Sequence, residues 1–536
     1  MDLIWTNIRV PVEEEESLLI SRMAHKLRVP PQSISGLRIV RRSLDARKKP
    51  QLFFSYTLTF NLELPIKEVQ RILSRNRDLK PEPIEEPILL SKPDKRLTHR
   101  PIVIGAGPAG YFAALALAQK GYAPLVLERG DAVIERTRKV NEFWESGNLD
   151  TESNVQFGEG GAGTFSDGKL TTRISDRRIT EVLHAFVKAG APTEIQYLAK
   201  AHIGTDILKQ VVQGLRQEII ALGGEVRFRT KLTGLQKTTE KMTGVGVNGN
   251  EEIPAEAVIL AIGHSARDTY EMLLDHEIQI EQKAFAIGLR IEHPQELINR
   301  SQYGVEEHPK LGPADYQLTY QDQLTGRGAY AFCMCPGGKV VAAASEEERL
   351  VTNGMSVYRR DSGIANSALV VTVGQNDFGS SHPLAGIEFQ RHWEHQAFLA
   401  GGRNYYAPVQ CVPDFLKGQE SDDFSCPSSY IPGVTAVDLH HVLPKPVSEV
   451  LERALTSFDH KIKGFAGETA TLTGVETRTS APIRITRDEN GEALGIKGLF
   501  PAGEGAGYAG GIISAAVDGI RAAERLMAQY APVGRS

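Results

Sequence analysis

The sequence predicts an α/β protein in which a doubly wound domain is split by an inserted mixed domain and preceded by a small α+β domain. Residues 98–285 alternate short apolar segments, glycine turns and alanine-rich helical segments, which is typical of a parallel sheet covered by helices. Segments with the composition of strands dominate residues 286–460, and the glycine-rich pattern returns in residues 461–536. Residues 1–97 show neither pattern and end in a proline-rich, charged segment.

The composition excludes several classes of protein. The chain has 536 residues, about three and a half times a typical ~150-residue domain, with 41% hydrophobic and 24% charged residues. No apolar run approaches the ~18 residues of a transmembrane helix, and the start lacks the pattern of a signal peptide. We therefore expect a cytoplasmic protein with no membrane partner. Four cysteines are too few for a disulfide framework, and their spacing does not match zinc-binding pairs, so no metal is expected.

The N-terminal 97 residues show a β-α-β-β-α pattern, which suggests a ferredoxin-like α+β domain. The expected elements are a strand at 3–10, a helix at 17–27, a hairpin of strands 35–44 and 51–64, and a helix at 65–76. The segment 80–96 is proline-rich and charged, and we interpret it as the linker to the next domain.

This domain is mildly basic, because several cations lie close together around the expected hairpin. They are Arg38, Arg41, Arg42, Arg47, Lys48 and Lys49. A solvated face is our interpretation, and contact with RNA or with an acidic partner is the alternative. Nucleic acid is therefore not the expected partner.

The pattern GxGxxG occurs four times, and its context decides what each copy means. Only the copy at Gly105, Gly107 and Gly110 directly follows an apolar strand, opens a helix and precedes a second strand that ends at Glu128. The copy at 244–249 has no helix after it and predicts a hairpin turn. The first copy thus predicts a Rossmann-like β-α-β unit that binds a dinucleotide.

Each position in that unit has a physical reason. Gly105 permits the tight turn, Gly107 lets backbone N–H groups approach a pyrophosphate, and Gly110 lets helix and strand pack closely. Glu128 lies 128 − 107 = 21 positions after the second glycine, where a carboxylate accepts ribose hydroxyls. A carboxylate there disfavours the 2′-phosphate of NADP.

Three later segments resemble the FAD-binding motifs of the glutathione-reductase type of FAD/NAD(P)-binding superfamily. They are FGEGGAGTFSDGKL at 157–170, AVILAIGHSA at 257–266 and LFPAGEGAGYAGGIISAAVDGI at 499–520. The resemblance implies that Glu504 holds a ribitol hydroxyl and that the helix after the last glycines faces the flavin ring. Ile262 stands where that superfamily usually has threonine.

Together with AHIGTDIL, LGGEVRF and CMCPGG, these segments resemble the uncharacterised FAD-dependent dehydrogenase (FAD-utilising oxidoreductase) family of bacteria and plastids. The resemblance covers about residues 98–525 and implies bound FAD and oxidoreductase activity. The expected cofactor-binding residues are Gly105, Ala106, Gly107, Pro108, Ala109, Gly110, Glu128, Arg129, Gly160, Gly161, Thr164, Gly263, Gly503, Glu504, Gly510, Gly511 and Ile512.

The flavin carries the redox step in such enzymes, so no catalytic triad is required. GxSxG, HExxH and CxxC are absent, which argues against a disulfide reductase. Cys333 and Cys335 alternate on an expected strand and would share one face, and with Lys169 they are the candidate catalytic residues. Small buried strand residues are the alternative for both thiols.

Several other polar residues are candidates for the site, and each has a structural alternative. Ser166, Lys169 and Arg290 are candidates for anchoring an anionic substrate, with surface or cofactor-side roles as the alternative. His264 is interpreted as a satisfied turn histidine, with a proton shuttle as the alternative, and His440 and His441 as structural. We give metal binding by Cys411 and Cys426 little weight.

We therefore expect an FAD-dependent oxidoreductase that passes a hydride between flavin and a small-molecule substrate. No second glycine-rich β-α-β unit is present, so NAD(P)H is expected only as a transient reductant. A flavin monooxygenase is one alternative. A non-catalytic, FAD-stabilised RNA-binding or assembly factor is the other. No pattern in the sequence assigns a substrate, a catalytic acid or base, or an oligomeric state.

Overall fold

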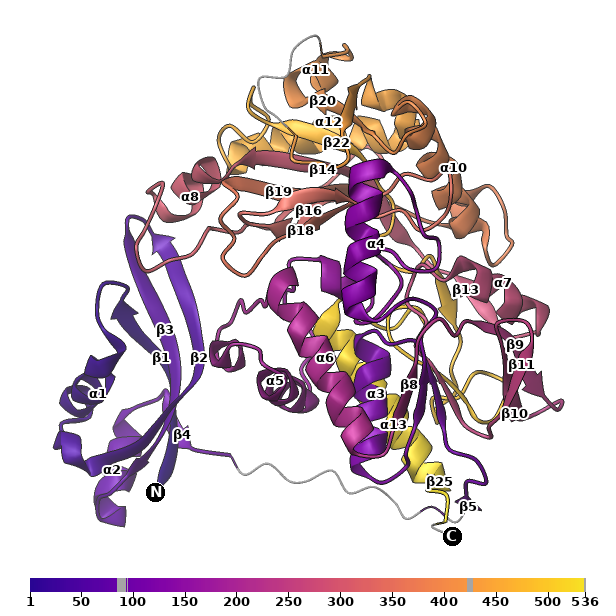
Figure 1. Ribbon diagram of the computed structural model, residues 1–536. Helices are drawn as coiled ribbons and strands as arrows, with labels where there is room; N and C mark the ends of the chain where they lie inside the picture. Colours follow the sequence, from indigo (N-terminus) through magenta and orange to yellow (C-terminus); the bar gives the residue numbers. More distant parts are fainter. Residues whose placement is uncertain (84–92, 94, 422–427, 535–536) are drawn as a thin grey trace.

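The computed structural model describes residues 1–83, 93, 95–421 and 428–534. Figure 1 shows three parts: an N-terminal sheet with two helices, a central part, and a larger sheet at the top of the view. In the central part, one side of β8 (Glu225–Arg227) holds the helices α5 (Arg178–Lys188), α6 (Thr205–Ala221), α3 (Pro108–Gln119) and α13 (Ile512–Gln529). None of the described helices combines the length and apolar character that crossing a bilayer needs.

The N-terminal part is a four-stranded antiparallel sheet covered on one face by two helices. Its strand order is β2 (Ile34–Lys48), β3 (Gln51–Leu62), β1 (Asp2–Pro11) and β4 (Leu79–Pro81), with helices α1 (Leu19–Leu27) and α2 (Ile66–Arg75). Leu19 and Met23 of α1 and Val69 of α2 are buried against sheet residues such as Trp5. Strand β4 occupies the start of the expected linker, and residues 84–92 and 94 of that linker lie outside the described residues.

The central part is a five-stranded parallel sheet built from both halves of the chain. Its strand order is β24 (Leu499–Pro501), β12 (Val258–Leu260), β6 (Ile102–Ile104), β7 (Leu125–Leu127) and β8 (Glu225–Arg227). These strands are short and fully apolar at their centres because both faces are covered. Because β24 pairs beside β12, the last segment of the chain completes the sheet that the first glycine motif begins.

Helices cover one face of this sheet, and a small antiparallel sheet covers the other. The helices are α3 (Pro108–Gln119), α5 (Arg178–Lys188), α6 (Thr205–Ala221) and α13 (Ile512–Gln529). The opposite face holds β9 (Leu232–Lys237), β10 (Met242–Val247), β11 (Glu251–Pro254) and α7 (Arg267–Asp275). Strands β10 and β11 pair in antiparallel register around residues 248–250, so the hairpin predicted for the third glycine motif is confirmed.

The upper part is a seven-stranded mixed sheet. Its order is β15 (Leu318–Gln321), β16 (Gly328–Cys335), β19 (Ile364–Val373), β14 (Phe285–Pro294), β22 (Thr471–Glu476), β20 (Ala407–Cys411) and β21 (Val434–Ala436). The sheet extends past residue 460, where the sequence placed the end of the inserted domain, because β22 pairs with both β14 and β20. The chain returns to the lower part only after β22, when β23 (Ile483–Ile485) pairs with β13 (Ile280–Gln282).

The remaining elements connect or flank these sheets. They are β5 (Lys95–Arg96), α4 (Val133–Ser146), α8 (Gln295–Tyr303), β17 (Lys339–Ala342), β18 (Thr352–Met355), α9 (Gln375–Phe378), α10 (Ala385–Ala400), α11 (Val412–Lys417), α12 (Lys445–Lys461) and β25 (Tyr530–Ala531).

Two helices from opposite ends of the central part pack closely through glycine. A methyl group on Gly519 of α13 would lie 2.0 Å from the carbonyl oxygen of Ala109 in α3. A methyl group on Gly503, just after β24, would lie 2.7 Å from Cβ of Ala109. Both contacts hold the start of α3 against the C-terminal segment.

Gly519→Ala should lower the stability of the whole chain, because the new methyl group must push α13 away from α3. Overpacking of this kind costs about 1–3 kcal/mol. The measurement is thermal unfolding beside Gly312→Ala, where a methyl group meets no atom within 4 Å. Equal melting temperatures for the two variants would contradict the close packing.

Candidate functional site

A cavity of about 1250 Å³ lies between the parallel sheet and the seven-stranded sheet. Its lining includes Ile104, Leu127, Ala261 and Ala502, which end or follow the central strands. Ligands of doubly wound sheets bind at these carboxyl ends. The volume exceeds the ~300–1,000 Å³ of a typical small-molecule site, so the cavity has room for a dinucleotide and a second molecule.

The first glycine motif forms one wall of the cavity. Gly105 has a φ of +101°, and a methyl group there would lie 2.3 Å from the carbonyl oxygen of Ala261. A methyl group on Gly110 would lie 1.8 Å from the carbonyl oxygen of Gly105. Helix α3 begins at Pro108 without a side-chain cap, and Gly107 and Pro108 both line the cavity. The positive end of the helix dipole is therefore available to a phosphate.

Glu128 lies at the end of β7, where the sequence predicts it, and is 5% exposed. Its carboxylate accepts hydrogen bonds from the backbone N–H groups of Ala106 (2.8 Å), Gly130 (2.9 Å) and Gly158 (2.9 Å). One side chain thus fixes three loops around the cavity edge. The neighbouring Arg129 pairs with Glu152 and Asp268, so its guanidinium is also held in place.

The second glycine motif lies against the first. A methyl group on Gly161 would be 3.0 Å from Cα of Gly107, so these two loops touch through glycine. The fully buried Arg136 of α4 donates hydrogen bonds to five backbone carbonyls within residues 154–161. Burial lowers the pKa of Arg136 to about 10. The sequence analysis missed Arg136, because nothing in a single helical arginine shows which loop it supports.

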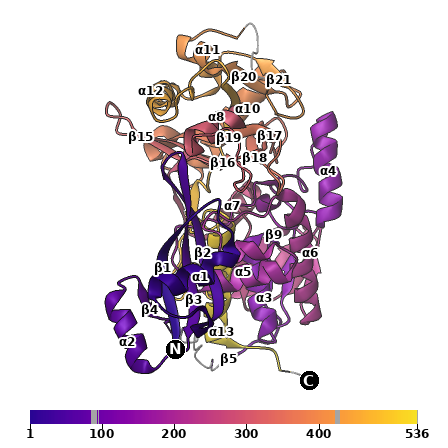
Figure 2. The ribbon, with the colours of Figure 1, turned by 90° about the vertical axis from the view of Figure 1, so that its left-hand side faces the viewer.

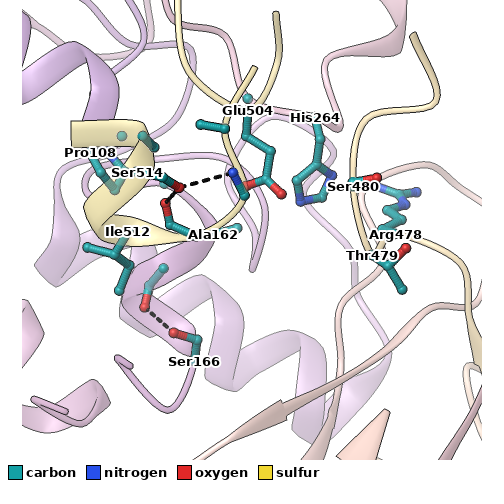
Figure 3. A pocket seen from close by; sticks show the side chains of 18 of the residues that line it. Pro108, Ala162, Ser166, His264, Arg478, Thr479, Ser480, Glu504, Ile512 and Ser514 are labelled. Carbon is teal, nitrogen blue, oxygen red and sulfur yellow. Dashed lines mark hydrogen bonds between the residues drawn. The ribbon is translucent and has the colours of Figure 1, made fainter. Parts of the chain in front are cut away.

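The C-terminal glycine segment forms the opposite wall. Figure 3 shows Glu504 between the start of α13, marked by Ile512 and Ser514, and His264. Burial raises the pKa of Glu504 to about 7, and the positive charge of Lys283 opposes that rise. Buried Tyr270 donates hydrogen bonds to the carbonyls of Gly263 (2.9 Å) and Gly505 (2.8 Å), which ties the two segments together.

A buried charge network supports the side of the cavity near His264. Glu394 of α10 accepts hydrogen bonds from Arg267 at 2.7 and 2.8 Å and from Arg478 at 3.1 Å. The two guanidinium groups hold the pKa of Glu394 well below its usual range. Burial and the same two arginines lower the pKa of His264 to about 3, so the imidazole is neutral near pH 7. A neutral, cavity-lining histidine fits the turn interpretation rather than the shuttle.

Most of the residues predicted to bind the cofactor line this cavity. They are Gly105, Gly107, Pro108, Ala109, Glu128, Arg129, Gly161, Gly263, Glu504, Gly510, Gly511 and Ile512. Ala106, Gly110, Gly160, Thr164 and Gly503 do not line it. These residues lie behind the lining residues and hold the neighbouring loops in place. The N–H of Gly160, for example, donates to the carbonyl of Ala106 at 2.8 Å, and Gly503 donates to Asp518 at 2.7 Å.

The part of the cavity next to the large sheet, here named the sheet-side lobe, is lined by residues of 166–174, of 315–319 and of strands β16 and β18. Cys333 and Cys335 both line it. Cys333 has a φ of +48° at an irregularity in β16, so its side chain is exposed to the cavity while Cys335 is buried. Although Cys333 is exposed, the enclosing protein raises its thiol pKa to about 11.

The three candidate anchors for an anion have different surroundings in the structure. Lys169 lines the sheet-side lobe. Arg290 does not, because it is fully buried and pairs with Glu476 at 2.9 Å while donating to the Cys333 carbonyl at 3.2 Å. Ser166 donates to the carbonyl of Gly163 at 2.6 Å, so its hydroxyl holds the loop. Arg290 and Ser166 are therefore supports of the wall rather than anchors.

The N-terminal part contacts both segments that lead into the sheet-side lobe. Arg42 of β2 exchanges backbone hydrogen bonds with Tyr197 (2.7 Å) and Ala199 (2.9 Å), just before the lining residue Lys200. Lys310, just before the lining residues 315–317, donates to the carbonyl of Glu13 at 2.8 Å. Figure 2 shows this N-terminal sheet in front of both other parts.

Within the described ranges, no group of three or more metal-ligating side chains occurs. Cys426 lies outside these ranges, and Cys411 is buried. His440 bonds to Asp438 and Glu452 and stacks on Phe415, which agrees with its interpretation as structural.

The fold and the cavity define a nucleotide-binding oxidoreductase, and comparisons with known proteins agree. The family described as "Pyridine nucleotide-disulphide oxidoreductase" matches residues 99–272, and "FAD-dependent protein, C-terminal domain-like" matches residues 284–479. A domain of unknown function matches residues 3–61. An uncharacterized protein of Clostridium beijerinckii is 52% identical over 528 residues, covering 98% of each chain. The chain therefore belongs to a family of FAD-dependent oxidoreductases, and it binds FAD.

The likeness to solved structures is weak. The flavin-dependent brominase Bmp2 has 12% identity and a TM-score of 0.36, covering 80% of this chain and 79% of the brominase. A geranylgeranyl bacteriochlorophyll reductase-like protein of Thermoplasma acidophilum has 15% identity and a TM-score of 0.35, covering 81% and 78%. At these scores the likenesses carry no argument about the reaction.

Glu128→Ala should weaken FAD binding at least ~10-fold, because three backbone N–H groups at the cavity edge lose a charged acceptor and each such bond contributes about 1.5–3 kcal/mol. FAD release is measured by the recovery of flavin fluorescence on dilution. Glu142→Ala on the exposed face of α4 is the matched control. Unchanged release from Glu128→Ala would contradict the assignment.

Removal of the Glu504 carboxylate should change how stability depends on pH. Its raised pKa means that the folded apoprotein binds this proton more tightly than the unfolded chain does, so stability is lost as pH rises from about 4.5 through about 7. From pH 5 to pH 8, the apoprotein should lose on the order of 1–3 kcal/mol relative to Glu504→Gln. Denaturant unfolding at both pH values measures the difference, and parallel pH profiles would contradict it.

Proposed function

We propose that the protein is an FAD-dependent dehydrogenase or reductase that passes a hydride between flavin and a small-molecule substrate in the sheet-side lobe. The observation that carries the proposal is one continuous cavity, which joins the FAD motifs on one side to Lys169 and Cys333 on the other. When bound, FAD supplies the two-electron step. The chain must then bind the substrate, exclude water and handle one proton.

The sheet-side lobe contains a side chain that can donate a proton to the substrate. The thiol of Cys333 faces the cavity and stays protonated near pH 7, because its pKa is raised to about 11. The backbone carbonyl of Cys333 is held by Arg290 at 3.2 Å, which fixes this residue at its positive φ. A positioned thiol of this kind donates a proton more readily than it attacks as a thiolate.

The alternative of an RNA-binding factor has less support, because several cations of the basic N-terminal part form ion pairs or hydrogen bonds with other residues of the chain. Arg42 pairs with Glu16 and lies over the rings of Phe54 and Tyr197. Arg47 pairs with Asp45 at 2.7 Å, and Arg38 pairs with Glu82 at 3.1 Å. Lys49 donates to the carbonyl of Ser301. These cations hold the N-terminal part together or attach it to the rest.

The proposal predicts a yellow protein whose flavin is reduced by a small molecule. The test is a visible spectrum of the purified protein, followed by anaerobic titration with NADH, NADPH and a metabolite panel. Bleaching of the flavin band by one of these, and its return with an electron acceptor, is the expected result. Cys333→Ser should keep the FAD spectrum but slow substrate turnover. We propose that NAD(P)H, where it is the reductant, binds only transiently.

Two outcomes would contradict the proposal. Oxygen uptake that requires both substrate and NAD(P)H would indicate a monooxygenase instead. A photoreduced flavin that no acceptor reoxidises would indicate a non-catalytic role.

A further inference from the structure

We infer that the sheet-side lobe binds an organic carboxylate, and that Lys169 pairs with its anionic group. This inference rests on the proposed function and adds the chemical class of the substrate. It depends on how the charges that line the lobe are paired, on the position of Lys169 and on the apolar wall opposite.

Two of the charged pairs at the lobe are complete. Asp167 accepts hydrogen bonds from Arg360 at 3.0 and 2.5 Å and from Ser356 at 2.5 Å. Lys200 and Asp315 form an ion pair at 2.6 Å. Each of these cations is therefore matched by a carboxylate and leaves no net charge for a ligand.

Lys169 and Arg173 remain as an excess of positive charge. The ammonium group of Lys169 lies 3.9 Å from the already occupied Asp167, beyond hydrogen-bond distance. Arg173 lines the lobe and is exposed, and no ion pair joins it to another described residue. Net positive charge in a cleft with low-dielectric walls attracts an anion and raises its local concentration.

Lys169 lines the cavity beside the two cysteines of β16. Its charge acts on the thiols of Cys333 and Cys335, which belong to the large sheet. The expected pyrophosphate site lies instead at Gly107 and the start of α3. A charge-assisted hydrogen bond from Lys169 is thus available to a second molecule.

The rest of the lobe is apolar enough to hold an organic body rather than a bare inorganic anion. Tyr330 and Phe332 line it from β16, and Ile174 lines it from the loop that carries Lys169. One cationic anchor beside aromatic and aliphatic surface is the arrangement that fits a carboxylate with an apolar chain or ring.

The test compares carboxylates with their neutral amides on the FAD-loaded protein. Benzoate, cinnamate and hexanoate are titrated beside benzamide, cinnamamide and hexanamide, and binding is followed by calorimetry and by the shift of the flavin band. At least one acid should bind ~10-fold more tightly than its amide, and added salt should weaken it.

Matched variants assign the effect to one side chain. Lys169→Met should weaken binding of that acid ~10-fold, and Lys169→Arg, which keeps the charge, should largely restore it. Lys188→Met on α5 removes the same charge outside the cavity and should leave binding unchanged. FAD content is measured for every variant, so that loss of cofactor is not mistaken for loss of the anion site.

The inference is overturned if no acid binds up to about 20 mM, if amides bind as tightly as acids, or if Lys169→Met binds like the wild type. Any of these results with FAD still bound and reducible would leave the proposed function standing. A preparation that holds no FAD would instead remove the proposed function.

Discussion

The cavity depends on the close approach of three backbone segments that meet without side chains between them. Gly105 touches the Ala261 carbonyl, Gly161 touches Gly107, and Gly519 touches the Ala109 carbonyl. Each contact lies at or below the distance a Cβ atom tolerates, so glycine is required at all three positions. The starts of α3 and α13 therefore reach the same cavity, so the positive ends of two helix dipoles are available to a cofactor there.

Around this centre, buried ion pairs support the cavity wall. Glu394 and Glu346 pair with Arg267 and Arg478, and Glu476 pairs with Arg290. Lys169 also lines the cavity, and its nearest carboxylate, Asp167, already pairs with Arg360.

The N-terminal part contacts the segments that lead into the sheet-side lobe. Its strand β2 pairs with residues 197–199, and Lys310 reaches back to Glu13, so this part touches both segments that lead into the sheet-side lobe. A shift of the N-terminal sheet would therefore move both walls of the lobe together.

The sequence alone determined the dinucleotide motif, Glu128 and the hairpin at 244–249, because each depends on local spacing along one or two elements. It also singled out Glu504 and Lys169 as candidates, and both line the cavity. The tertiary structure decided the rest. It showed that β22 belongs to the large sheet, that the two thiols of β16 differ in exposure, and that Arg290 is internal. Those outcomes follow from pairing and packing between segments far apart in the chain, which no local pattern encodes.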